Sequence, residues 1–253
     1  MHLPSIVIGR QFCGPPNSGN GGYVCGVLAG DLAGPATAVL RAPIPLDAPL
    51  ALEARGGGRV MTGADGQLIG QGGPSAGAEL PDPPPAPSLD AARAAGARYV
   101  GLATPFHPIC FTCGTDRGEG DGLRVFAGQL EGAAQGVVAG VWRPHADFAD
   151  SSGLTRTEVI WAALDCPGYF AWVEREGRHS ALLGTMTGEV LRRPAAGEDA
   201  IVVAWPLARE GRKETAGVVL YSAKGELLAR AHQVWIVMGP RPPVEPANAA
   251  ATA

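Results

Sequence analysis

The chain has few charged residues and no long apolar run, and these absences exclude several classes of protein. Charged residues make up 17% of the 253 residues and the net charge is −4, so nothing favours binding to nucleic acid or an anionic membrane. No run approaches the ~18–20 apolar residues that a membrane span needs. The first residues, Met-His-Leu-Pro-Ser, lack the basic and apolar regions of a signal peptide, so we expect a cytoplasmic protein.

The cysteines form no complete metal-binding or redox signature. Cys110-x-x-Cys113, preceded by His107, stands alone, whereas a structural zinc site takes four ligands. A redox Cys-x-x-Cys usually opens a helix in a βαβ unit, which this region does not resemble. The other cysteines are scattered: Cys13, Cys25 and Cys166. We therefore expect five reduced thiols, no metal and no cofactor, and no Ser-His-Asp chemistry.

Glycine and proline are abundant, and the apolar residues fall into two similar series of segments. The chain has 37 Gly and 23 Pro, which favour many turns, while 46% hydrophobic residues fit a well-buried core. The first series is a strand at 5–12, a helix at 18–31, and strands at 36–41, 50–54, 59–62 and 68–71. The second is strands at 122–126 and 135–143, a helix at 155–175 interrupted at Pro167, and strands at 182–191, 200–208, 215–222 and 227–237.

The two series predict an α+β protein with two curved antiparallel sheets, each wrapped around one central helix. The sheets would form one continuous or closely apposed layer. We expect a first unit over 1–75, a second over 98–238, and a flexible tail over 239–253. Residues 76–97 would form a Pro-rich linker ending in a short helix at 89–95 capped by Ser88.

The first central helix carries a Gly21-Gly22 pair close to its start. The first N–H groups of a helix have no partner within it, so they can stabilise an oxyanion while glycine lets a substrate approach. Asn17 and Asn20, just before the pair, could orient water or an acyl chain. The alternative is packing, since Gly22, Gly26 and Gly30 are four residues apart and would form a smooth stripe.

The second central helix carries Asp165 directly after an apolar run at 159–164. A buried carboxylate must be paired, hydrogen-bonded or protonated. We expect Pro167 to kink the helix and leave Asp165 near a local helix end, where the dipole disfavours negative charge. Both effects would raise its pKa, as suits a general base or a nucleophile. The alternative is a structural Asp bonded to backbone N–H groups.

Three short motifs, and the order of the elements, resemble the hotdog-fold acyl-CoA thioesterase superfamily, in its two-hotdog form. Gly21-Gly-Tyr-Val-Cys-Gly-Val-Leu-Ala29 is similar to the helix start of these enzymes. Pro43-Ile-Pro-Leu-Asp-Ala-Pro49 is similar to their Pro-rich corner, and Cys110-Phe-Thr-Cys-Gly-Thr-Asp-Arg-Gly-Glu-Gly-Asp-Gly-Leu-Arg-Val125 to the opening segment of many small thioesterases. The resemblance covers about residues 5–72 and 105–238.

The resemblance implies that the carbonyl-binding glycine and the acid come from opposite helices. It assigns Gly21 and Gly22 to the carbonyl and Asp165 to catalysis. Single-hotdog relatives often place the acid eight or nine residues after the Gly pair on the same helix. That spacing puts Gly30 or Asp31 at the acid position of the first helix, with Asp31 the weaker acid candidate. It puts Thr157, a further substrate-binding candidate, at the glycine position of the second, so we expect one competent site per chain.

The predicted function is hydrolysis of an acyl-CoA or related acyl thioester by a chain that could also form homo-oligomers. Two alternatives stay open. One is a non-catalytic acyl-thioester binding protein. The other is an enoyl-thioester hydratase, suggested by His145 in Arg143-Pro-His-Ala-Asp147. The histidines His107 and His232 carry no specific signal.

Overall fold

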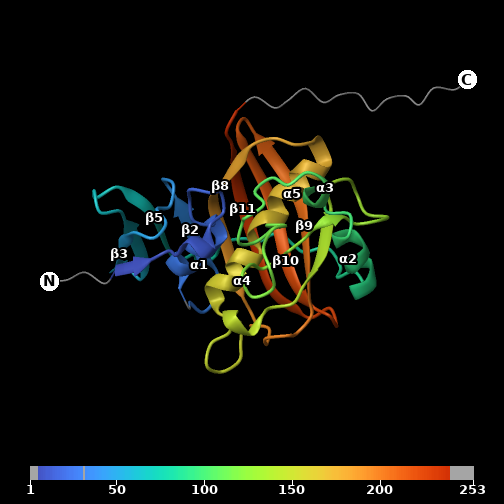
Figure 1. The fold of residues 1–253 in the computed structure, drawn as a ribbon, viewed down its shortest axis with the longest axis horizontal. Coiled ribbons are helices and arrows are strands. Elements are labelled where there is room, and N and C mark those ends of the chain that lie inside the picture. Colours follow the sequence, from blue (N-terminus) through green and yellow to red (C-terminus); the bar gives the residue numbers. More distant parts are fainter. Residues whose placement is uncertain (1–4, 31, 240–253) are drawn as a thin grey trace, which may run out of the picture.

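One eleven-stranded antiparallel sheet forms the frame of the protein (Figure 1). The computed structural model describes residues 5–30 and 32–239. The strand order is β1-β3-β4-β5-β2-β8-β11-β10-β9-β7-β6. The two sheets expected from the sequence are therefore joined, because Ala36–Val39 of β2 pair with Thr185–Gly188 of β8.

The first half of the chain contains five strands and one helix. They are β1 (Ser5–Val7), α1 (Gly21–Ala29), β2 (Ala36–Leu40), β3 (Pro49–Arg55), β4 (Gly58–Thr62) and β5 (Leu68–Pro74). The sequence predicted these elements within a few residues, except that the first strand is shorter. Its expected end forms the 3₁₀ helix η1 (Arg10–Phe12).

The second half supplies the rest of the sheet and the longer helices. They are α2 (Leu89–Gly96), α3 (Val100–Ala103), β6 (Gly128–Gln129), β7 (Val138–Trp142), η2 (Ala146–Phe148), α4 (Thr157–Ala163), α5 (Asp165–Glu176), β8 (Ala181–Val190), β9 (Ala200–Glu210), β10 (Lys213–Ser222) and β11 (Leu227–Val237). The strand predicted at 122–126 is wrong. The backbone N–H groups of Leu123 and Val125 donate instead to the carbonyls of Phe111 and Thr112, which lie within Cys110-x-x-Cys113, called the cysteine motif below.

Helices cover both faces of this sheet. The main core lies on the face packed by α1, α4 and α5, and Val202 and Ala204 of β9 point into it. The alternate residues Ile201 and Val203 face the other side, where they pack against Ala92 and Ala95 of α2. The Pro-rich segment before α2 is fixed by Tyr221, whose hydroxyl donates to the carbonyl of Pro84 at 2.6 Å.

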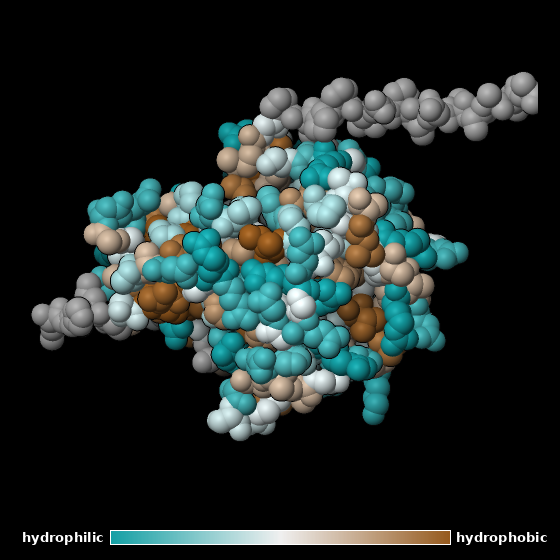
Figure 2. Space-filling view, viewed as in Figure 1, coloured by the Kyte–Doolittle hydropathy of each residue, from teal (hydrophilic) through white to brown (hydrophobic). Residues whose placement is uncertain are grey.

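The face shown in Figure 2 is mostly polar, with separate apolar patches. No helix among the described residues is long and apolar enough to cross a membrane. The C-terminal tail and Asp31 lie outside the described residues, apart from Gly239 at the start of that tail.

Candidate active site

The N-terminal end of α1 contacts the junction between α4 and α5, and Gly22 and Asp165 meet there. The backbone N–H of Gly22 donates a hydrogen bond to Asp165 Oδ2 at 3.0 Å. A Cβ at Gly22 would lie 2.6 Å from the Asp165 Cβ and 2.7 Å from the carbonyl oxygen of Trp161. The sequence-predicted pairing of a helix-start glycine with an acid on the opposite helix is thus present as a direct contact.

Glycines let α1 and α4 pack closely along their length. A Cβ at Gly26 would lie 2.5 Å from the Cα of Glu158 and 2.9 Å from the Trp161 Cβ. Because residue numbers rise along α1 as they fall along α4, the helices run antiparallel. Gly30 instead caps the C-terminal end of α1, where its φ of 66° is a conformation that favours glycine. Gly22 therefore serves packing and also donates its N–H to the acid.

Asn20 links α1 to the cysteine motif and, through it, to α4. Its Oδ1 accepts from the backbone N–H of Tyr23 at 2.8 Å, which caps the helix, and its Nδ2 donates to Thr112 Oγ1 at 3.2 Å. The Thr112 hydroxyl donates in turn to the carbonyl of Ala162 at 2.8 Å. Asn20 is 1% exposed. Thr112 was not predicted, because nothing in the sequence distinguishes it from other residues of a polar loop.

Burial dominates the electrostatics of Asp165, which is 3% exposed. Burial raises its pKa from the ordinary 3.8 to about 7. The hydrogen bond from the Gly22 N–H favours the charged form and so lowers the pKa, but this effect is smaller than that of burial. The neighbouring Cys110 raises the pKa further and the nearby Asn20 amide lowers it. Asp165 Oδ1 makes no direct hydrogen bond to any part of the chain that the structure describes.

The helix break falls at Leu164, three positions before Pro167, where the sequence predicted the interruption. Asp165 is the first residue of α5, and Pro167 lies in its first turn, where backbone N–H groups have no partner to lose. Asp165 follows the end of α4, as expected, but it also begins α5, whose dipole favours an anion at that position, so the two helix ends oppose one another. The raised pKa comes from burial instead.

Gln233 on β11 holds this break in place. Its Nε2 donates to the carbonyls of Leu164 at 2.7 Å and Asp165 at 3.0 Å, and its Oε1 accepts from Trp235 Nε1 at 2.8 Å. Gln233 was not among the residues predicted from the sequence, although Ala231, Gln233 and Trp235 alternate along the strand and share its buried face.

The other predicted site residues lie apart from this contact. Asn17 is exposed in the turn before α1. A Cβ at Gly21 would lie 3.2 Å from the side chain of Leu183, so that residue faces β8. Thr157 begins α4, at the opposite end of that helix from Asp165. Asp31 lies outside the described residues.

The contact between Gly22 and Asp165 is closed to solvent. Two surface hollows occur elsewhere: one lies beside the end of α1 and the turn around Gly57, and the other lies around Arg124 and His145. Neither is lined by Gly22 or Asp165. Neither hollow gives access to Asp165, which is 3% exposed.

The structure does not favour a hydratase built on His145 or a hydrolase built on a serine nucleophile. His145 Nδ1 lies 3.3 Å from Asp147 Oδ2, and both side chains are exposed. Gly73-Pro-Ser-Ala-Gly77 has the Gly-x-Ser-x-Gly spacing of a nucleophile elbow, which requires a helix directly after the serine. Ser75 follows β5 and leads into the Pro-rich segment, so the elbow is not formed.

Solved structures share this fold across nearly the whole chain. A candidate thioesterase from Novosphingobium aromaticivorans is 16% identical, with a TM-score of 0.61 over 93% of this chain and 95% of that one. A candidate thioesterase II from Thermobifida fusca is 16% identical, with a TM-score of 0.58 over 93% and 92%. The TesB protein of Mycobacterium avium subspecies paratuberculosis is 14% identical, with a TM-score of 0.51 over 81% and 78%.

The likeness to these solved structures shows that the chain has the hotdog fold. No protein-family profile matches the chain, and no curated protein matches it by sequence.

Proposed function

We propose that the protein hydrolyses acyl thioesters, with an acyl-CoA as the substrate class, at the contact between α1 and α5. The observation that carries this proposal is the 3.0 Å hydrogen bond between the Gly22 N–H and Asp165 Oδ2. It joins an oxyanion donor to an acid, and the two come from central helices of different halves of the chain. We infer that β1–β5 with α1, and β6–β11 with α4 and α5, are two hotdog units that make one site.

The chemistry requires the thioester carbonyl to replace the carboxylate at Gly22. The carbonyl oxygen accepts the Gly22 N–H, and the released Asp165 carboxylate takes a proton from water. The hydroxide adds to the carbonyl carbon, and the oxyanion is stabilised by the helix-start N–H. The carbon–sulfur bond then breaks, and protonated Asp165 returns its proton to the leaving thiolate.

The environment of Asp165 suits this role. A general base works best when its pKa lies near the working pH, and burial raises the pKa of Asp165 to about 7. Its unpartnered Oδ1 is free to bind water once the helix contact opens. Hydrogen bonds from Asn20 to Thr112 and from Thr112 to the Ala162 carbonyl connect the start of α1 to the end of α4, and so position the donor opposite the acid before a substrate binds.

A second candidate function is binding of an acyl thioester without turnover. It is favoured by the closed contact, because Asp165 is 3% exposed and already occupies the Gly22 N–H. If ligand binding does not separate the two groups, the acid stays a structural partner of the helix start.

The test measures free CoA and acid released from a panel of acyl-CoAs by chromatography. Asp165→Asn keeps the shape and one oxygen for the Gly22 N–H, so it should lose turnover while it still binds a non-hydrolysable acyl-CoA thioether. The matched control is Asp90→Asn, the same change on the exposed face of α2. Unchanged hydrolysis in Asp165→Asn contradicts the assigned base. Binding without turnover in the unmodified protein supports the second candidate, and hydration of crotonyl-CoA would identify a hydratase.

A further inference from the structure

Three cysteine side chains meet beside the helix break, in a group that we call the cysteine cluster: Cys110, Cys113 and Cys166. Their sulfur atoms all lie within 4.8 Å of one another, and Cys110 and Cys166 Sγ are 3.7 Å apart. All three thiols are free and buried. The sequence alone offered only two ligands in Cys110-x-x-Cys113, and the fold adds the third from the first turn of α5.

The spacing of the sulfur atoms fits a shared metal ion. Zinc–sulfur bonds of about 2.3 Å place the sulfurs of a tetrahedral or trigonal site about 3.8–4.0 Å apart. The 3.7 Å between the Cys110 and Cys166 sulfurs is close to that spacing, and all three sulfurs lie within 4.8 Å of one another. Buried cysteines in an ordinary core are single apolar side chains, which do not require three thiols to converge.

The Cys110-x-x-Cys113 turn is built as a metal-binding turn would be. The Gly114 N–H donates to the carbonyl of Cys110 at 2.9 Å, and a Cβ at Gly114 would lie 2.4 Å from that oxygen. Asn20 Nδ2 also donates to Cys110 Sγ at 4.0 Å, so a polar group faces this sulfur from the start of α1.

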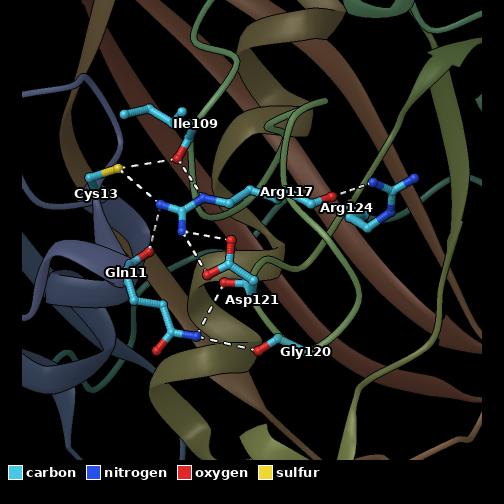
Figure 3. A network of polar contacts seen from close by, with 7 residues as sticks. All are labelled: Gln11, Cys13, Ile109, Arg117, Gly120, Asp121 and Arg124. Carbon is cyan, nitrogen blue, oxygen red and sulfur yellow. Dashed lines mark hydrogen bonds and ion pairs between the residues drawn. The ribbon is translucent and has the colours of Figure 1, made fainter.

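Arg117 fixes the loop that carries two of the thiols (Figure 3). Its guanidinium donates to the carbonyls of Ile109 at 2.8 Å and Gln11 at 3.0 Å, and it pairs with Asp121 at 2.9 Å. Tyr99 and Phe170 belong to the same buried apolar cluster as the three cysteines. The thiols are thus presented from a fixed loop and a fixed helix start inside an apolar shell.

We propose that Cys110, Cys113 and Cys166 form a three-thiolate site for a thiophilic d10 cation, with Zn²⁺ as the occupant, whose fourth position is filled by an exchangeable ligand. Soft thiolate sets select such ions. The ion would tie the loop between α3 and β6 to the start of α5. The bound ion would also hold the Asn20–Thr112–Ala162 chain and the first turn of α5 in one arrangement. The site does not depend on the proposed hydrolysis.

The experiment uses the full chain, freed of metal with a chelator under reducing, anaerobic conditions, and titrates it with Co²⁺. One Co²⁺ per chain is expected, with sulfur-to-cobalt charge-transfer absorption in the near ultraviolet and intense visible bands that Zn²⁺ abolishes. Cys113→Ser and Cys166→Ser should each lose at least half of the charge-transfer absorption. Cys25→Ala is the matched control, because Cys25 is buried in α1 away from the cluster, and it should keep the full spectrum.

A second measurement keeps the proposal testable if a cluster variant fails to fold. In the folded unmodified protein, Zn²⁺ should slow alkylation of three of the five cysteines at least tenfold, and mass mapping should identify them as the cluster. Absence of sulfur charge transfer in the folded, metal-free chain on Co²⁺ addition overturns the proposal. So does a full spectrum in Cys166→Ser, or equal alkylation with and without Zn²⁺.

Discussion

Gln233 Nε2 donates a hydrogen bond to the backbone carbonyl of Asp165 at 3.0 Å, so the middle of β11 is tied to the start of α5. Its Oε1 lies so close to Gly168 that a Cβ there would fall 1.8 Å from it. One buried amide therefore sets where α4 stops, where α5 starts and how the Asp165 side chain is aimed. This positioning is independent of the hydrogen bond from Gly22.

Gln233→Leu should destabilise the protein because it leaves the buried Trp235 N–H without a partner and removes the hydrogen bonds that Gln233 donates to the carbonyls of Leu164 and Asp165. These two carbonyls lie at the start of α5 and also accept helical N–H groups, so one buried group is left unsatisfied, and we expect a loss of about 1–3 kcal/mol in the free energy of unfolding in urea. The control Gln67→Leu changes an exposed side chain and should stay within about 0.5 kcal/mol. Equal stability of the two variants would show that Gln233 does not hold the break.

Gly22→Ala and Gly26→Ala distinguish the two roles of the glycines in α1, which are close packing against the neighbouring helices and donation of the Gly22 N–H to Asp165. Both insert a methyl group against α4, 2.6 Å from Asp165 Cβ and 2.5 Å from Glu158 Cα respectively. Overpacking of about 1–3 kcal/mol is opposed by about 1 kcal/mol of helix propensity. We expect both to lower the melting temperature, and Gly22→Ala alone to abolish thioester hydrolysis through loss of donor alignment.

Gly9→Ala is the control for these variants, since no atom lies within 4 Å of its added Cβ. It should leave both the melting temperature and turnover unchanged. If Gly26→Ala abolishes turnover as completely as Gly22→Ala, the donor role of Gly22 is not separable from packing, and the site assignment fails.

Arg117→Lys should destabilise the protein even though it keeps the charge. Arg117 is 11% exposed and reaches two carbonyls and a carboxylate at once, which the single ammonium of lysine cannot match. We expect a loss of about 1–3 kcal/mol in urea unfolding. Arg41→Lys, on the exposed end of the loop after β2, should change the stability by less than about 0.5 kcal/mol. A similar loss in both variants would contradict the anchoring role.

Local patterns predicted most of the fold because alternation and turn residues determine strands directly. Strands β8 to β11 were placed within two residues of their observed ends, since β11 alternates between buried and less buried residues while β9 and β10 contain apolar runs buried on both faces. Segment 122–126 has the same apolar character, but Leu123 and Val125 pair with the cysteine motif. That competition between partners depends on tertiary contacts, which a local pattern does not contain.

In the candidate site, too, local sequence patterns predicted some features, while others depend on tertiary packing. Gly22 and Asp165 were identifiable because a Gly pair at a helix start and an acid in an apolar helix are unusual. Their hydrogen bond, the role of Thr112 and the convergence of Cys166 on Cys110 depend on how two helices and a loop pack. The sequence predicted the break at Pro167, and α4 ends at Ala163, whose carbonyl faces the N–H that Pro167 lacks.

Asp165→Asn should change how stability depends on pH, with a direction fixed by the raised pKa. The ordinary pKa of the carboxyl is 3.8, and in the folded protein burial raises it to about 7. Between these values the unfolded chain is ionised while the native chain holds the proton, so stability falls as pH rises. The gap corresponds to about 4 kcal/mol, fully present below pH 3.8 and lost once the pH passes about 7.

Asn cannot ionise, so the free energy of unfolding of Asp165→Asn minus that of the unmodified protein should rise by a few kcal/mol between pH 4 and pH 8. Urea unfolding across this range measures it, with chelator present throughout so that no cation at the cysteine cluster contributes. Asp90→Asn, which removes an exposed carboxylate, should give a difference that stays flat over the same range. A flat difference for Asp165→Asn as well would mean that the buried carboxylate is stabilised as an anion in the native protein. Asp165 would then be a poor base at neutral pH, and the binding function would be the better account of the site.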